Sequence, residues 1–438
     1  MLSSRPFRWD IVEEQMDEAD FLWSRWEAAL RAPEYVLAEV RELEERLEAH
    51  LDGLELGGTP VAERLLHPAI AEAEVSRVSA AAYVLLAQDG AALEQLRVLL
   101  EEGSPAQREG IRRALELCGW DEIETRVLPW LEGQPGPVHS VALEVLVFRG
   151  YTLPGGVPPE WVSSEEPTVA AAALRAMSLS PVGLNGGLLE RALGSYIPEV
   201  HEAALECGAV LGRRAAWKVC QQRAAEGAPS RLALLLLAMG GGEVGLEVLK
   251  RRLLVPAQRV EALWALDFSG QVAAADLCVE LLGDQDILVA RLAAEAFCAI
   301  SGLELEGAYV QEEKERDAEL PVEEELDQDL SPKPEDGLKR AEPVTVARWW
   351  GSARSRFELR GRYLRGQPWS ASRLVEALGQ EPMRRRAVLA MELAIRTKGQ
   401  HRLQAGTWAW RQLQQLGRLK GLREESLSQP FESLLRGD

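Results

Sequence analysis

The stretch PEVHEAALECGAVLG, residues 198–212, decides the fold, because it is a complete helix signal that the chain goes on to repeat. A proline opens it, a glycine closes it, and the apolar positions between them recur every three or four residues. That period of 3.6 predicts a helix and not the alternation of a strand. Proline suits the first helical position and glycine the position after the last, so both ends agree with a short helix.

The same phrase recurs along most of the chain. Its openings are Pro105, Pro137, Pro167, Pro198, Pro229 and Pro256, which are 32, 30, 31, 31 and 27 residues apart. Glu74 and Asp286 extend the register by 31 and 30 residues at the two ends. A fixed period of about 30 residues, with two short helices in each unit, predicts an α-solenoid of HEAT type.

These boundaries divide the chain into four parts. We expect an all-α protein with about eight HEAT-like helix pairs over residues 59–303. Residues 1–58 are expected to form an N-terminal helical cap, because their second helix has one narrow apolar stripe on a charged rod. This cap is also a candidate contact for a homodimer. Residues 304–343 are expected to form an acidic linker or loop, and residues 344–438 a basic C-terminal helical block.

Composition restricts the class of partner and the compartment. The formal net charge is −20, which disfavours bare nucleic acid or an anionic membrane as partner for the whole chain. The longest apolar run, residues 232–239, is far shorter than the roughly 20 residues that cross a bilayer. The first 14 residues do not resemble a secretory signal. The five cysteines form no CxxC pair, which indicates reduced thiols and a cytoplasmic protein.

The charge reverses near the C-terminus. Residues 304–343 carry 15 acidic and 5 basic side chains, a balance of 5 − 15 = −10, and residues 344–438 carry 18 basic and 8 acidic ones, 18 − 8 = +10. Arginine binds phosphates and indole rings stack on bases, so nucleic-acid binding by this block is one alternative. The adjacent acidic segment would compete with a polyanion, which favours protein contact instead. The candidate partner-contact residues are Trp349, Trp350, Arg356, Arg362, Tyr363, Arg365, Arg384 and Arg385.

The same block carries a resemblance. Its segments Trp349-Trp350, Arg356-Phe357, residues 361–368 (GRYLRGQP) and residues 384–396 (RRRAVLAMELAIR) resemble the closing block of a bacterial family of uncharacterised HEAT-repeat proteins. The repeats before the acidic segment are similar to that family too. The resemblance implies an accessory or adaptor role, near type VI secretion genes for some members, and it supplies no catalytic residues.

An enzyme built on such repeats is the other alternative. The repeats resemble those of deoxyhypusine hydroxylases, which hold di-iron with several His-Glu dipeptides, but this chain has one, His201-Glu202. They also resemble bilin lyases, without independent support for tetrapyrrole binding. No nucleophile elbow, zinc motif or phosphate loop is present. We therefore expect no catalytic, cofactor or metal residues and a non-enzymatic interaction scaffold or adaptor for a protein partner. The alternatives are a lyase or hydroxylase, or nucleic-acid binding.

Overall fold

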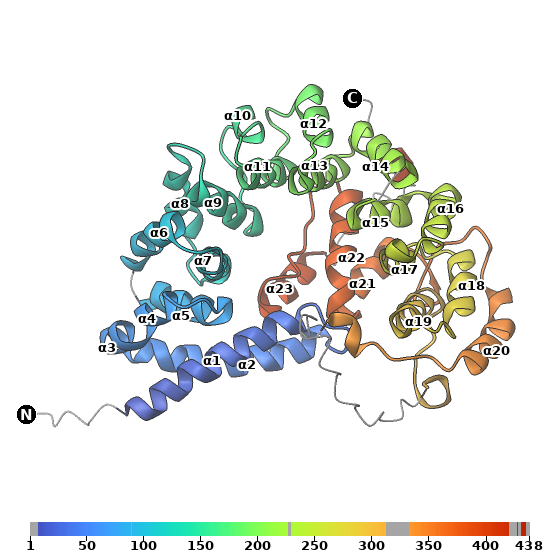
Figure 1. Cartoon of the computed structure of the whole chain (residues 1–438), viewed down its shortest axis with the longest axis horizontal. Coiled ribbons are helices and arrows are strands. Elements are labelled where there is room, and N and C mark those ends of the chain that lie inside the picture. Colours follow the sequence, from blue (N-terminus) through green and yellow to red (C-terminus); the bar gives the residue numbers. More distant parts are fainter. Residues whose placement is uncertain are drawn as a thin grey trace, which may run out of the picture.

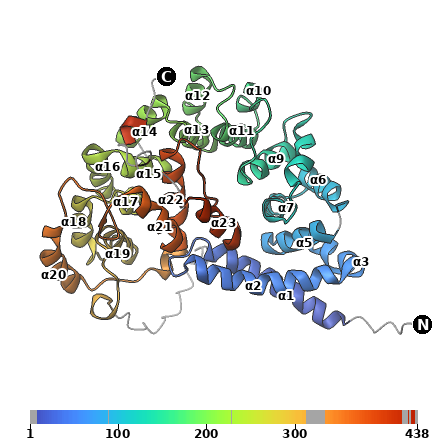
Figure 2. The same cartoon turned by 180° about the vertical axis from the view of Figure 1, so that it is seen from behind.

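In the part of the chain that is described, the regular structure is helical apart from one hairpin of two short strands. The computed structural model describes residues 8–88, 90–226, 229–311, 333–419, 427 and 431–434. Its helices follow one another around an arc, and the last of them lie inside that arc (Figures 1 and 2). The N-terminal helices and the C-terminal block therefore meet, although they are distant in sequence.

The N-terminal part is a long helical pair followed by short turns. Helix α1 spans Trp9–Ala29 and helix α2 spans Leu37–Leu56, and the two pack against each other. Three short helical segments connect them to the repeats: α3 (Gly58–Val61), the π-helix η1 (Ala62–Leu66) and α4 (His67–Ile70).

The central part contains two rows of helices. The inner row is α5 (Val75–Gln88), α7 (Pro105–Leu117), α9 (Pro137–Phe148), α11 (Pro167–Leu179), α13 (Pro198–Val210), α15 (Arg231–Gly240), α17 (Pro256–Asp267) and α19 (Ile287–Ser301). The outer row is α6 (Ala92–Glu102), α8 (Ile123–Val127) with η2 (Leu128–Leu131), α10 (Pro159–Val162), α12 (Gly186–Leu193), α14 (Arg214–Glu226), α16 (Gly242–Leu253) and α18 (Val272–Leu281). Each inner helix packs on the next inner helix, and Figure 1 shows the outer row on the convex side.

The repeated prolines do set the helix starts. Five of the six predicted openings are the first residue of an inner helix, and α15 begins two residues after Pro229. At α15 and α19, which lack proline at the first position, a side chain caps the helix: Ser230 accepts a hydrogen bond from the Ala233 N–H, and Asp286 accepts one from the Leu288 N–H at 3.0 Å. Small residues then allow close packing. A Cβ on Gly208 of α13 would lie 2.4 Å from the Cβ of Ala216 in α14.

The two described ends of the acidic segment contact each other. Val310 and Ala341 form an antiparallel bridge, and the Glu342 N–H donates to the Tyr309 carbonyl at 2.8 Å. Two short turns, η3 (Gly307–Tyr309) and η5 (Pro334–Gly337), flank this bridge. Residues 312–332, which carry most of the acidic side chains of this segment, lie outside the described residues.

The C-terminal block first extends the arc and then turns back inside it. Helix α20 (Pro343–Ala353) packs on α18 and is followed by η6 (Arg354–Arg356). The hairpin β1 (Tyr363–Leu364) and β2 (Gln367–Pro368) pairs Tyr363 with Pro368 in antiparallel register. The remaining elements are α21 (Ala371–Gln380), α22 (Met383–Arg396), α23 (Ala409–Leu419) and η7 (Phe431–Leu434).

No helix among the described residues is both long enough and apolar enough to cross a membrane.

Candidate interaction site on the inner surface

The inner surface of the arc is occupied by the chain itself. We call residues 362–419, which comprise the hairpin and helices α21 to α23, the strap. Figures 1 and 2 show these helices on the concave side of the arc. Helix α22 packs on α13 and helix α23 packs on α2. The strap therefore connects the middle of the arc to its N-terminal pair.

Arginines of the strap bind the C-terminal ends of inner helices. The last carbonyls of a helix have no partner within the helix and form the negative end of its dipole, so a guanidinium group both satisfies and complements them. The pairs are Arg362 Nη2 to Phe268 O at 2.9 Å, Arg402 Nη2 to Ser178 O at 2.6 Å and Arg411 Nη2 to Cys118 O at 2.7 Å. These carbonyls belong to the ends of α17, α11 and α7, so the strap spans a large part of the arc.

An aromatic pocket holds the strap at the N-terminal side. Trp408 lies among Trp23, Trp26 and Tyr83, with ring centroids 5.9, 4.6 and 5.8 Å away. Its indole N–H donates to the Leu117 carbonyl at 3.0 Å. Because an indole buries a large apolar area and its one polar group is satisfied here, Trp408 is an apolar anchor of the strap.

Glu44 supports the same contact with a buried carboxylate. Its Oε1 accepts hydrogen bonds from the Ala409 N–H at 2.6 Å, at the start of α23, and from the Trp26 indole at 2.9 Å. The side chain is fully buried, and this burial raises the pKa of Glu44 to about 7 against the hydrogen bonds and Arg41, which lower it. Glu44 thus holds α23 to α2 and binds a proton more tightly in the folded protein than in the unfolded one.

Glu44→Gln should reduce the dependence of stability on pH. A carboxylate whose pKa is raised by folding, from 4.5 to about 7, stabilises the fold least when it is ionised. The wild-type protein should therefore lose about 2–3 kcal/mol through Glu44 between about pH 5 and pH 8. Glutamine keeps the acceptor oxygen without the charge, so this loss should be absent in the variant. Urea unfolding at both pH values measures the difference, and parallel pH profiles for the two proteins would contradict the assignment.

A second, charged contact holds the strap near the end of the arc. Arg385 donates to Asp267 at 2.6 Å and also pairs with Glu381. Arg384 donates to Glu295 of α19 at 2.9 Å and to Glu335, in η5 of the acidic segment, at 2.8 Å. We call these six residues the charged cluster.

The charged cluster is buried and strongly polarised. Burial raises the pKa of Asp267 and of Glu295 above their usual range. Burial lowers the pKa of Arg385, but the facing carboxylates outweigh it and raise that pKa overall. Beside it, the Met383 N–H donates to the Tyr35 carbonyl at 2.8 Å, so the loop between α1 and α2 joins the strap at this point. A perturbed cluster of this kind is a functional-site signal, although ion pairs that only hold structure give the same signal.

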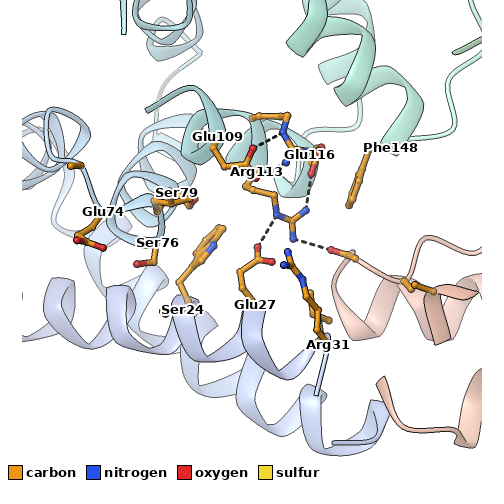
Figure 3. Close-up of a pocket in the computed structure, with 18 residues that line it drawn as sticks. Ser24, Glu27, Arg31, Glu74, Ser76, Ser79, Glu109, Arg113, Glu116 and Phe148 are labelled. Carbon is orange, nitrogen blue, oxygen red and sulfur yellow. Dashed lines mark hydrogen bonds and ion pairs between the residues drawn. The ribbon is translucent and has the colours of Figure 1, made fainter. Parts of the chain in front are cut away.

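Next to the strap, an open cleft of about 530 Å³ remains on the inner surface. Helices α1, α5, α7 and α9 line it, and the strap supplies one wall through Ala387, Ala405 and Gly406. Figure 3 shows Arg113 at its centre. The guanidinium of Arg113 donates to Glu27 and Glu116, both at 2.7 Å, and to the Gly406 carbonyl at 3.0 Å.

Charged side chains like those in the cleft recur near the middle of successive inner helices, about 30 residues apart in the sequence. The eighth or ninth residues of successive inner helices are Arg112, Glu144, Arg175 and Glu206, then Trp264 and Glu295; the corresponding part of α15 is apolar. Glu144 lies 3.5 Å from Arg112 and 3.6 Å from Arg175. Toward the end of the arc the same position faces the strap, where Arg384 lies over the Trp264 ring at 4.1 Å and binds Glu295. The same position of the inner helices therefore contributes Arg112 to the open cleft and Trp264 and Glu295 to the contact with the strap.

The predicted contact residues divide into buried and exposed ones. Arg384, Arg385 and Tyr363 are buried within the strap contacts, and Arg362 pairs with Glu392 besides binding the end of α17. Trp350 is also buried and donates to Asp276 at 2.8 Å.

The other three are more accessible. Trp349 is half-buried beside Phe297, whereas Arg356 and Arg365 are exposed. Arg365 lies 3.5 Å from Glu381, at the edge of the charged cluster. These three, together with the partly exposed Arg362, therefore offer side-chain surface to a separate molecule in this conformation.

The sequence did not predict the buried carboxylates that bind the strap, nor the tryptophan that anchors it. Asp267 and Glu295 lie inside apolar helical phrases, and Glu44 is one of many acidic residues on the charged second helix, so the sequence does not distinguish them. Only the repeat register contained a signal for Glu295, because it stands one period after Trp264. Trp408 had no comparable signal, since its pocket comes from α1 and α5.

The described residues contain no group of three His, Cys, Asp or Glu side chains placed to hold a metal ion. His201 of the single His-Glu pair instead makes a 2.7 Å hydrogen bond with the Leu193 carbonyl. No protein-family model matches the chain, and no curated protein matches it significantly.

Proposed function

We propose that this protein is a HEAT-type α-solenoid that acts as a scaffold or adaptor for a protein partner, without chemistry of its own. One observation carries the proposal: the inner surface already binds a polypeptide, the strap, through helix-end carbonyls and an aromatic pocket. Beside the strap it leaves a cleft lined by side chains of several repeats. A solenoid suits this role because its neighbouring units fix the shape of a long surface.

The arrangement of helices supports the solenoid part of the proposal. Each inner helix packs on the preceding and following ones, and the unit length follows the proline period. The resemblance to bacterial HEAT-repeat proteins extends the proposal to a cytoplasmic adaptor role, and to accessory work in a secretion system. A homodimer through the N-terminal pair remains part of it, since Ile11 and Phe21 of α1 are exposed.

Nucleic-acid binding is less well supported than protein binding. The basic block owes its charge partly to arginines whose guanidinium groups face carboxylates or helix-end carbonyls. Such groups are not presented to phosphates in this conformation, so the balance of +10 overstates the charge open to a polyanion.

Filling the cleft should abolish capture of the partner. Ser24 of α1 is exposed and lines the cleft, so Ser24→Trp places an indole there. We expect tagged wild-type protein to retain a specific protein from lysate of its source cells and the variant to lose most of it. Affinity capture followed by mass spectrometry measures the enrichment.

The matched control is Glu18→Trp, on the same helix and exposed, but outside the cleft. It should capture the partner as the wild-type protein does. Equal capture by both variants would place the partner elsewhere. Capture of no specific protein, together with a tightly bound metal in the purified wild-type chain, would count against the scaffold function itself.

A further inference from the structure

The strap has a small core of its own. Helix α21 packs on both α22 and α23, and buried leucines fill the space between them. Arg386 lies inside this core, where it donates to the Leu378 carbonyl and to Gln412, both at 2.6 Å. The three helices therefore hold one another together independently of the arc.

The contacts between strap and arc combine polar pairs with apolar packing. They comprise the guanidinium–carbonyl pairs at helix ends, the charged cluster and a few backbone hydrogen bonds, with helix packing at α13 and α2. Groups of this kind regain hydration when they separate, and buried ion pairs contribute little net stability. Two parts of one chain can move relative to each other unless the interface between them is large and predominantly apolar.

One apolar contact stands out in this interface. Trp408 is 2% exposed in a pocket of three aromatic rings contributed by α1 and α5. A buried indole surrounded by polar contacts is the usual form of an interaction hot spot. Separation of the strap would leave this pocket open, next to the cleft that Ala405 and Gly406 now border.

We propose that the strap is a displaceable intramolecular ligand, which competes with a protein partner for the inner surface at the Trp408 pocket. The partner that fits is a polypeptide with a tryptophan just before a helix, because the pocket accepts the indole and Glu44 accepts the first N–H of the helix. This inference rests on the proposed scaffold function for the existence of the partner. The competition itself is a property of this chain.

The test uses a fluorescent peptide of residues 402–419 as the probe, added to the full chain. Trp408→Ala should empty the pocket, so the variant chain should bind the peptide about tenfold or more tightly than the wild-type chain, whose own strap competes. The matched control is Trp410→Ala, two residues away and 36% exposed, which should behave as the wild type does. A peptide with Trp408→Ala should not bind. Absence of peptide binding to the Trp408→Ala chain would overturn the proposal.

A second measurement needs no variant, and it decides the matter if Trp408→Ala fails to fold. In hydrogen exchange of the wild-type chain, the amides that donate from the strap to the arc, those of Met383 to Tyr35 O and of Arg365 to Ala299 O, should exchange about tenfold or more faster than those of α7 and α11, because the strap opens without the arc. Equal protection would show that strap and arc open only together, and would also overturn the proposal. Both readouts are independent of partner capture, so a failure here is distinct from a failure of the scaffold function.

Discussion

Arg385→Met is expected to lower the free energy of unfolding by about 3–5 kcal/mol, since it removes the cation from a buried set of carboxylates. In the wild-type protein Arg385 is 3% exposed and binds both Asp267 and Glu381. Without it these carboxylates face each other away from water. Denaturant unfolding followed by circular dichroism measures the loss as a shift of the midpoint.

Two further variants distinguish the effect of leaving buried carboxylates unpaired from the effect of removing any arginine from this block. Arg356→Met changes an exposed residue of the same block and should leave the midpoint almost unchanged. Replacing the pair together, as Asp267→Leu with Arg385→Met, should recover much of the stability, because a buried ion pair can be exchanged for apolar side chains at little cost. A stable single variant would mean that the charged cluster does not hold the strap.

Leu235→Asp should be at least as damaging, at about 4 kcal/mol or more, because it puts an unpaired charge between neighbouring helices. Leu235 lies in α15 and is 6% exposed. Thermal unfolding and the yield of folded protein measure the effect.

Leu254→Asp is the matched control. Leu254 follows α16 and is 83% exposed, so its carboxylate would remain in water and the melting temperature should stay close to that of the wild type. Similar melting of Leu235→Asp and the wild-type protein would refute the packing described for the middle of the arc.

The sequence was sufficient for the local elements. Proline at the first position and small residues on the packing face act within a few residues of chain, so the starts of α7, α9, α11, α13 and α17 could be predicted to the residue. The all-helical class followed from the same period. The arrangement around an arc is consistent with the predicted solenoid, and its assignment to the HEAT type remains a proposal.

The course of the strap could not be predicted in this way. It depends on pairs such as Arg385 with Asp267, which are 118 residues apart, and Arg402 with Ser178, 224 residues apart. The count of basic residues predicted a surface that is open to partners. In the structure, several of those arginines instead form ion pairs or hydrogen bonds with carboxylates and carbonyls of the repeats. Charge balance records how many groups are present, but it does not record which of them face each other.

The aromatic pocket has a consequence for how the molecule is made. Trp23 and Trp408, whose rings lie 5.9 Å apart, are separated by 408 − 23 = 385 positions of chain. At about 5–20 residues per second, a ribosome needs roughly 20–80 s to add that length. During this time Trp23 and Trp26 have emerged without the indole that covers them. Nascent chains are therefore expected to rely on chaperones until translation passes Trp408, and products that stop earlier should be recognised and degraded as unfinished.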